Sequence, residues 1–211
     1  MFSKGNAMTE KDKMIAGKIY DSSNNELVIM RQRAHRLCKE YNDLLESDEK
    51  RMGILKELGF KGNNIYLQGP IQFDYGCFTS IGDNFYANFN FTCLDCCPVK
   101  IGSNVFVGPN VSILTPMHPL RWQDRNLCKK EDGSLFVKEY AKPVVIGNNC
   151  WIAGNVTICG GVTIGDGCVI GSGSVVTKDI PDNSLAYGIP CRKIRDITEL
   201  DSLNNHSELF A

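Results

Sequence analysis

The chain has 211 residues, of which 23 are Lys or Arg, 24 are Asp or Glu, and 43% are hydrophobic. This length allows one well-buried core with a small accessory segment. The balanced charge excludes the broad basic surface that binding to nucleic acid or to an anionic membrane requires, and no apolar stretch is long enough to cross a bilayer.

The first residues indicate a cytoplasmic protein. The start, "MFSKGNAMTEKDK", lacks the apolar middle of a secretion signal. Residues 1–7 are expected to be disordered, as chain ends commonly are.

Residues 8–62 predict a cap of three helices. Thr9 and Asp12 have the spacing of a capping box at the start of a short first helix. A second helix begins near Asn25, because apolar residues then recur at spacings of three and four. A third covers about residues 48–58. Such a segment is too small to fold well alone, so we expect it to lie on the main domain.

Two of the three histidines lie in these outer parts of the chain. His35 falls on the second helix among Arg31, Arg33 and Arg36, which favours a solvated or structural role. His206 lies in a polar C-terminal tail, residues 196–211, where no chemistry is expected of it.

A strict repeat of six residues runs through the rest of the chain: "IGNNCW IAGNVT ICGGVT IGDGCV IGSGSV" from Ile146 onward. The aliphatic residues that open the units are Ile146, Ile152, Ile158, Ile164 and Ile170. The small or β-branched residues four places later are Cys150, Val156, Val162, Cys168 and Ser174. A helix would show spacings of three, four and seven and a flat strand would alternate by two, whereas a coil of short strands accounts for a period of six.

The repeat predicts a mainly β fold, in which a parallel β-helix of hexapeptide repeats spans residues 63–195. The same period appears earlier, in "IGDNFYANFNFTCL" and "IGSNVFVGPNVSIL". Asn90, Asn110 and Asn155 stand in glycosylation-type sequons, but we interpret them as corner residues of the coils.

The ten cysteines are interpreted as reduced thiols, since a chain of this size does not need a disulfide framework. Cys150 and Cys168 take positions at which the repeat elsewhere places valine, which is typical of small buried hydrophobes. "CLDCC" (93–97) contains a C-x-x-C, but no second pair or suitably spaced histidine accompanies it, which argues against a zinc site.

The repeat stops after Leu114 and resumes in step at Ile146, so residues 115–143 form a long extruded loop. Long excursions from a compact coil are commonly functional. His118 lies near the start of this one and is the side chain there that is suited to moving a proton at neutral pH. The sequence therefore predicts a catalytic base at the break in the repeat.

Motifs along nearly the whole chain resemble the maltose and galactoside O-acetyltransferases of the hexapeptide-repeat superfamily. In chain order they are "IAGKIYD", "RLCKEYN", "FDYG", "IGDNFYANFN", "HPL", "IGNNCWIAGNVTICGGVTIGDGCVIGSGSVVTKDIP" and "GIPCRKIR". The resemblance implies a left-handed coil, a homotrimer with sites between subunits, and transfer of acetyl from acetyl-CoA to a sugar hydroxyl in a ternary complex. It also makes residues 8–62 the acceptor-side segment.

The resemblance assigns roles to particular residues. His118 and Asn88 match the catalytic group, with His118 as general base, and the backbone N–H of Gly154 matches the oxyanion donor. The residues matching the acceptor pocket are Asp21, Asp74, Tyr86, Asn88 and Asp95. Those matching the cofactor site are Trp151, Gly154, Gly171, Ser172, Thr177, Lys178, Arg192 and Arg195. No metal is expected.

Two alternatives remain open at this point, the first and third of the following, and the second is nearly excluded. A related enzyme that acetylates an antibiotic would use the same base and cofactor cleft. A zinc hydratase on the same prism would need about three histidines per metal, and His118 is the only one in the repeat region. A catalytically silent trimeric scaffold would not need His118, Asn88 and Lys178 to be intact.

Overall fold

The computed structural model describes residues 7–210. Residues 1–6, for which disorder was predicted together with residue 7, therefore lie outside the described range. Within residues 7–210, no helix is both long and apolar enough to cross a membrane.

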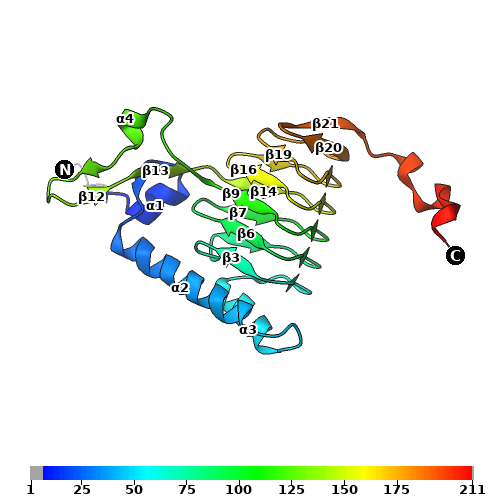
Figure 1. Cartoon of the computed structure of the whole chain (residues 1–211), viewed down its shortest axis with the longest axis horizontal. Helices are drawn as coiled ribbons and strands as arrows, with labels where there is room; N and C mark the ends of the chain where they lie inside the picture. Colours follow the sequence, from blue (N-terminus) through cyan, green and yellow to red (C-terminus); the bar gives the residue numbers. More distant parts are fainter. Residues whose placement is uncertain (1–6, 211) are drawn as a thin grey trace, which may run out of the picture.

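Three helices form the N-terminal cap, as predicted. α1 (Glu10–Ile15) begins with the capping box, in which Thr9 Oγ1 accepts a hydrogen bond from the Asp12 backbone N–H at 3.1 Å. α2 (Asn25–Asn42) and α3 (Lys50–Leu58) follow and lie along the foot of the column of coils (Figure 1). Buried side chains of both helices belong to the same hydrophobic cluster as the coils, so the cap closes the lower end of the core.

The column is a parallel β-helix, which confirms the fold predicted from the period of six. Its strands are β2 (Tyr66–Leu67), β3 (Ile71–Phe73), β4 (Thr79–Ile81), β5 (Tyr86–Ala87), β6 (Phe91–Leu94), β7 (Val99–Ile101), β8 (Phe106–Val107), β9 (Ser112–Leu114), β14 (Val144–Ile146), β15 (Trp151–Ile152), β16 (Thr157–Cys159), β17 (Thr163–Ile164), β18 (Val169–Ile170), β19 (Val175–Val176), β20 (Ser184–Gly188) and β21 (Cys191–Asp196).

Three sheets form the faces of the column. The seven-stranded sheet has the order β2-β5-β8-β15-β18-β20-β21, the five-stranded sheet β19-β16-β9-β6-β3 and the four-stranded sheet β17-β14-β7-β4. Strands of successive coils pair in parallel, and β21 returns antiparallel beside β20.

The chain turns three corners in each full coil, and the corners stack into three edges. At the glycine edge it passes from the seven-stranded to the five-stranded sheet, and at the excursion edge from the five-stranded to the four-stranded sheet. At the asparagine edge it passes from the four-stranded back to the seven-stranded sheet.

The interior of the column follows the repeat residue by residue. The opening isoleucines from Ile146 to Ile170 are at most 2% exposed, and so are the small residues four places later. Cys150 and Cys168 are among them, which confirms their prediction as buried hydrophobes. All ten cysteines are free. Burial of apolar surface in each coil is the main favourable contribution to this fold.

Asparagines with left-handed backbone angles stack along two edges. At the glycine edge, Asn90, Asn110 and Asn155 have φ near 60° (60°, 59° and 59°), which confirms that these sequon residues are corners. The side-chain amide of Asn90 donates to Asn110 at 2.8 Å, and that of Asn110 to Asn155 at 3.1 Å. At the asparagine edge, Asn104 donates in the same way to Asn149 at 3.1 Å. Asparagine tolerates this backbone region and here also links each coil to the next.

The excursion, residues 115–143, leaves the column at the excursion edge and has secondary structure of its own. Its elements are β10 (Pro116–Met117), α4 (Trp122–Arg125), β11 (Cys128–Lys129), β12 (Leu135–Phe136) and β13 (Lys138–Ala141). The excursion projects from the side of the column on which α1 lies, and the tail after β21 leads away on the other side (Figure 1). The tail contains the 3₁₀ turns η1 (Glu199–Asp201), η2 (Leu203–Asn205) and η3 (Ser207–Leu209).

Candidate functional site

A cavity of about 340 Å³ lies between the cap, the excursion edge and the excursion itself. It contains two of the predicted site residues, His118 and Asp74. Its other lining residues are Tyr20, Ser22, Arg31, His35, Cys96, Pro116 and Glu139. We refer to it as the His118 cavity.

A small antiparallel sheet holds His118 in this cavity. The central strand, β13, pairs with β10 of the excursion on one side and with β1 (Tyr20–Asp21) of the cap on the other. His118 directly follows β10, and its Nδ1 lies 3.4 Å from the backbone carbonyl oxygen of Lys138 on β13. A carbonyl oxygen can only accept, so this contact places the proton on Nδ1 and leaves Nε2 of the neutral ring as a proton acceptor.

Hydrogen bonds within the cavity wall orient its polar side chains. The Glu139 carboxylate accepts from the Tyr20 hydroxyl at 2.8 Å and from the Ser22 hydroxyl at 3.2 Å. Arg31 donates to the Tyr75 hydroxyl at 3.0 Å and to the Ser22 carbonyl at 3.3 Å. The cap and the excursion therefore share one polar network, and the wall is organised before any substrate binds.

Asp74 lines the cavity together with His35 and Cys96, which the sequence did not assign to the site. Its Oδ1 lies 3.5 Å from His35 Nε2, and its Oδ2 accepts from the Cys96 thiol at 3.5 Å. Burial and then the nearby Asp74 carboxylate raise the pKa of Cys96, so this thiol stays neutral and acts as a donor.

His35 is exposed as predicted, with 53% of its side chain accessible. The sequence did not predict that it also lines the His118 cavity. Arg31 and His35 are four residues apart on α2 and so share one face of that helix. This spacing was the sequence signal that could have placed the two residues together. The partners of that face, Tyr75 and Asp74, follow from the tertiary fold alone.

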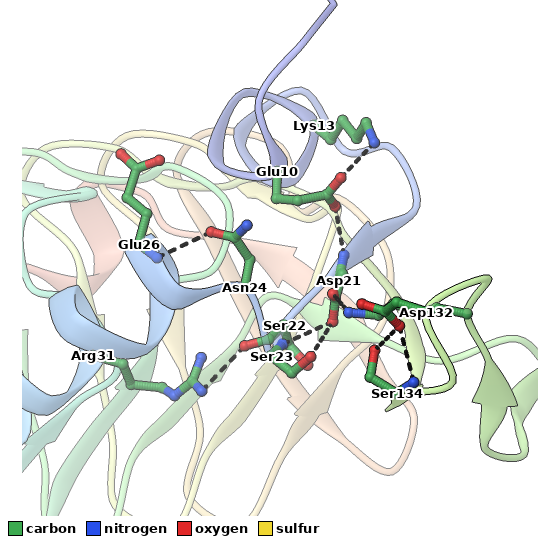
Figure 2. A network of polar contacts seen from close by, with 11 residues as sticks. Glu10, Lys13, Asp21, Ser22, Ser23, Asn24, Glu26, Arg31, Asp132 and Ser134 are labelled. Carbon is green, nitrogen blue, oxygen red and sulfur yellow. Dashed lines mark hydrogen bonds and ion pairs between the residues drawn. The ribbon is translucent and has the colours of Figure 1, made fainter.

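Asp21 lies outside the His118 cavity. Successive residues of β1 face opposite ways, so Tyr20 enters the cavity and Asp21 points toward the excursion. Its carboxylate pairs with Lys130. It also accepts from the Ser23 hydroxyl at 2.6 Å (Figure 2). Burial would raise the pKa of Asp21, but the hydrogen bonds from Lys130 and Ser23 outweigh it and hold the pKa below its usual value. In this chain Asp21 fastens the excursion to the cap.

Asp95 is fully buried at the excursion edge and does not line the cavity. One carboxylate oxygen accepts from the Tyr75 backbone N–H at 2.8 Å and the other from the Thr79 hydroxyl at 3.0 Å. Burial raises the pKa of Asp95 above its usual value.

Asp95→Asn is expected to gain stability relative to the wild type as pH rises. The raised folded-state pKa means that Asp95 favours folding most at acid pH, and this contribution is lost as pH rises through the folded-state value. Asparagine does not ionise and keeps an acceptor oxygen. Urea denaturation at one protein concentration measures the free energy of unfolding of both proteins at about pH 4 and about pH 7. The value for the variant minus the value for the wild type should be larger at the higher pH. A difference that shrinks would contradict the assignment of the raised pKa.

The remaining predicted residues lie on other parts of the column. Asn88, Gly154, Gly171 and Ser172 follow strands of the seven-stranded sheet and stand at the glycine edge, and Tyr86 and Trp151 lie on that sheet itself. Thr177 and Lys178 follow β19 at the excursion edge. Arg192 and Arg195 lie on β21. Within one chain, the structure thus separates His118 and Asp74 from Asn88 and Gly154 by a full face of the column.

The two arginines differ in what they contact. Arg195 is held by Asp201, with its two terminal nitrogens donating to the two carboxylate oxygens at 2.8 and 2.6 Å. Hydrogen bonds from Arg195 and from the Thr198 backbone lower the pKa of Asp201 to about 2. Arg192 donates only to the neighbouring Cys191 carbonyl, at 2.7 Å, among the contacts of the described chain. Arg192 is therefore the arginine with the freer guanidinium.

Within residues 7–210, no group of three or more His, Cys, Asp and Glu side chains is placed to hold a metal ion.

Two known sequence motifs match this chain. The maltose acetyltransferase hexapeptide capping motif matches residues 13–58, and the bacterial transferase hexapeptide pattern of six repeats matches residues 143–178. The first covers the helical cap and the second the regular coils above the excursion.

Full-length relatives agree with these motifs. The galactoside O-acetyltransferase of Escherichia coli K12 is 43% identical over 196 residues, which cover 92% of this chain and 91% of that protein. The crystal structure of a maltose O-acetyltransferase from Clostridium difficile 630 is 46% identical, with a TM-score of 0.82, and the match covers 92% of this chain and all of the other. A galactoside acetyltransferase solved in complex with coenzyme A is 42% identical, with a TM-score of 0.84, over 92% of this chain and 94% of that one. Since the similarity includes both the cap and the coils, the chain belongs to the maltose and galactoside O-acetyltransferase family of hexapeptide-repeat acyltransferases.

Proposed function

We propose that this protein transfers the acetyl group of acetyl-CoA to a hydroxyl of a sugar of the maltose, glucose or galactoside type. The observation that carries the proposal is the placement of His118 in a polar cavity with Nε2 free to accept a proton. Relatives that are named for this reaction, and one solved with coenzyme A, support the choice of donor and acceptor.

The reaction is a direct transfer in a ternary complex. His118 Nε2 takes the proton of the acceptor hydroxyl as the oxygen attacks the thioester carbonyl carbon. The tetrahedral intermediate then collapses, the C–S bond breaks, and His118 returns the proton to the leaving thiolate. The Gly154 backbone N–H stabilises the negative oxygen of the intermediate. No acyl-enzyme forms, so neither Cys96 nor any other thiol acts as a nucleophile.

We propose that the site is completed in a homotrimer. One chain carries His118 and Asp74 at its excursion edge and Asn88 and Gly154 at its glycine edge, which a rigid column cannot bring together. Placing the excursion edge of one copy beside the glycine edge of the next unites the two groups, and a closed ring with this heterologous contact repeats it at every interface. Three such sites then form per trimer.

Acetyl-CoA lies in this proposal along the seven-stranded sheet beside the glycine edge. Its pantetheine arm follows backbone groups at Gly171 and Ser172, and Trp151 offers an exposed ring, 54% accessible, on the same sheet. Arg192 is exposed on β21 and supplies a donor for the phosphates, and the exposed Thr177 and Lys178 at the excursion edge of the neighbouring copy supply others. Arg195 is a weaker phosphate ligand than the sequence predicts, because Asp201 already occupies its planar fork.

Arg192→Ala is expected to raise KM for acetyl-CoA about tenfold, with kcat and the sugar KM little changed, because the lost contact is a charge-assisted hydrogen bond to a phosphate. Steady-state kinetics with each substrate varied in turn measures this. Lys193→Ala, on the same strand, is the control, since Lys193 pairs with Asp196 at 2.5 Å. An effect confined to the sugar KM would remove Arg192 from the cofactor site.

The experiment that tests the proposed function is release of free thiol from acetyl-CoA in the presence of single acceptors. Glucose, maltose, galactosides and hydroxylated antibiotics form the panel. Turnover with the sugars supports the proposal. Turnover with the antibiotics alone identifies a xenobiotic O-acetyltransferase instead, and no turnover with any acceptor identifies a silent scaffold.

A further inference from the structure

His35 lines the His118 cavity, but the reaction described above gives it no role. Its side chain is 53% accessible, and its Nε2 lies 3.5 Å from Oδ1 of Asp74. The Asp74 side chain is 19% accessible and lines the same cavity. A substrate that enters the cavity can therefore reach both members of this pair.

The helix that carries His35 is firmly seated on the column. Ala34 and Cys38, which flank His35 on α2, are at most 1% exposed. α2 packs against β3, the strand that Asp74 directly follows. One turn before His35, Arg31 donates to the hydroxyl of Tyr75, the residue after Asp74, at 3.0 Å. The backbone of His35 is thus fixed relative to Asp74, and only the side-chain torsions of His35 remain free.

Two donors face the Asp74 carboxylate, one for each oxygen. The Cys96 thiol donates to Oδ2 at 3.5 Å, and His35 Nε2 faces Oδ1. An ionised carboxylate can only accept, so His35 carries a proton on Nε2 when it contacts Asp74. Each carboxylate oxygen has two lone pairs, so each can still accept a hydrogen bond from a substrate.

The value of Asp74 as an acceptor ligand depends on the orientation of its carboxylate. In the proposed function, Asp74 accepts a hydrogen bond from the sugar, and a ligand held in place before binding loses less entropy when the sugar arrives. The distance of 3.5 Å to His35 is longer than a typical N–H···O bond, and such contacts in ligand-free sites often shorten when substrate binds. Cys96 holds the carboxylate from the column, and His35 holds it from the cap.

We propose that His35 is a positioning residue, which donates from Nε2 to Asp74 Oδ1 and so orients the carboxylate toward a hydroxyl of the acceptor other than the one that reacts. This inference rests on the proposed function, because Asp74 must bind the acceptor. It makes a pair of hydroxyls, one for His118 and one for Asp74, the feature of the acceptor that the cavity recognises.

Two substitutions of His35 test this role. Leucine removes the donor, whereas the side-chain amide of glutamine carries a donor to about the place of Nε2. His35→Leu should raise KM for the acceptor about fivefold and leave kcat and KM for acetyl-CoA within about twofold, because a partly exposed hydrogen bond to a charged group is lost from the acceptor side alone. His35→Gln should keep KM for the acceptor within about twofold of the wild type.

The matched control is Gln32→Leu, since Gln32 is exposed on the same helix and does not line the cavity. It should leave KM for both substrates unchanged. Circular dichroism and the urea midpoint check that all variants are folded. A His35→Gln enzyme with the same defect as His35→Leu would overturn the role of the Nε2 donor.

A double substitution distinguishes positioning from a general effect on structure. Asp74→Asn should raise KM for the acceptor by itself. Adding His35→Leu should then change that KM less than twofold, because His35 acts through the Asp74 carboxylate. If His35→Leu has its full fivefold effect in the Asp74→Asn protein, the two residues act independently and the proposal is overturned.

Monodeoxy analogues of the preferred sugar identify the hydroxyl that Asp74 binds. For the analogue that lacks this hydroxyl, KM of the wild type should rise, and His35→Leu should change it less than twofold. An equal effect of His35→Leu on every analogue that keeps the reacting hydroxyl would overturn the proposal.

The outcomes for the positioning role and for the proposed function can be told apart. If the wild type acetylates sugars and His35→Leu keeps the wild-type KM for the acceptor, the positioning role is overturned and the proposed function stands. If the wild type acetylates an antibiotic but no sugar, the proposed function fails, and the same variants with that antibiotic decide the role of His35. If it acetylates no acceptor, both are overturned.

Discussion

His118→Ala is expected to lower kcat/KM for acetyl transfer by about 10²–10⁴-fold, the usual contribution of a positioned general base. The imidazole Nδ1 lies 3.4 Å from the Lys138 carbonyl oxygen, and the other imidazole that lines the cavity, His35, lies 3.5 Å from the Asp74 carboxylate. KM for acetyl-CoA should change little, since the proposed cofactor contacts lie on other residues. Steady-state kinetics with a sugar acceptor measures the loss.

The control for this prediction is His206→Ala, which removes a partly exposed histidine in the tail that contacts Glu208 at 3.2 Å. It should retain wild-type activity. Both variants should keep the wild-type circular dichroism spectrum and assembly mass. A His118→Ala enzyme within a few-fold of the wild type would remove His118 from the role of base.

Mixing two inactive variants is expected to restore activity. His118→Ala lacks the base at the excursion edge, and Asn88→Ala lacks the amide at the glycine edge. If each site takes one edge from each of two copies, random trimers from an equal mixture contain intact sites in about a quarter of positions. Unfolding and refolding the two proteins together, followed by an activity assay, should therefore recover about a quarter of wild-type turnover.

The two variants refolded separately and then combined provide the control, because preformed trimers that do not exchange subunits stay inactive. Failure to recover activity from the co-refolded mixture, while co-refolded wild type is active, would show that one chain supplies both residues. That result would contradict the shared site.

The core of this protein could be predicted from the sequence because the pattern that determines which side chains are buried lies within each six-residue unit. An aliphatic residue every six positions, with a small residue four places later, specifies which side chains point inward without reference to distant parts of the chain. Ile146, Cys150 and their repeats are buried as predicted. The three helices of the cap were also predictable, since the Thr9 capping box and the apolar spacing of α2 are signals contained in a few residues.

The site was less predictable because its residues meet through tertiary contacts. Resemblance to the maltose and galactoside O-acetyltransferases assigned His118 and Asp74 to one site, and the cavity contains both. Asp21 and Asp95 carry the same carboxylate chemistry, but β1 turns one toward Lys130 and the fold buries the other against Tyr75 and Thr79. His35 and Glu139 were missed because no short motif records that α2 and β13 line the same cavity.

The stacked asparagines explain how the column carries so large an interruption. Asn104 and Asn149 are bonded across 45 positions of sequence, and so are Asn110 and Asn155, so the two coils on either side of the excursion meet as if nothing had been inserted. The register of the two coils is therefore set by their own contacts and does not depend on the segment that bears His118. Substitutions in the outer part of that segment should therefore change the surroundings of the acceptor at little cost to the folding of the column.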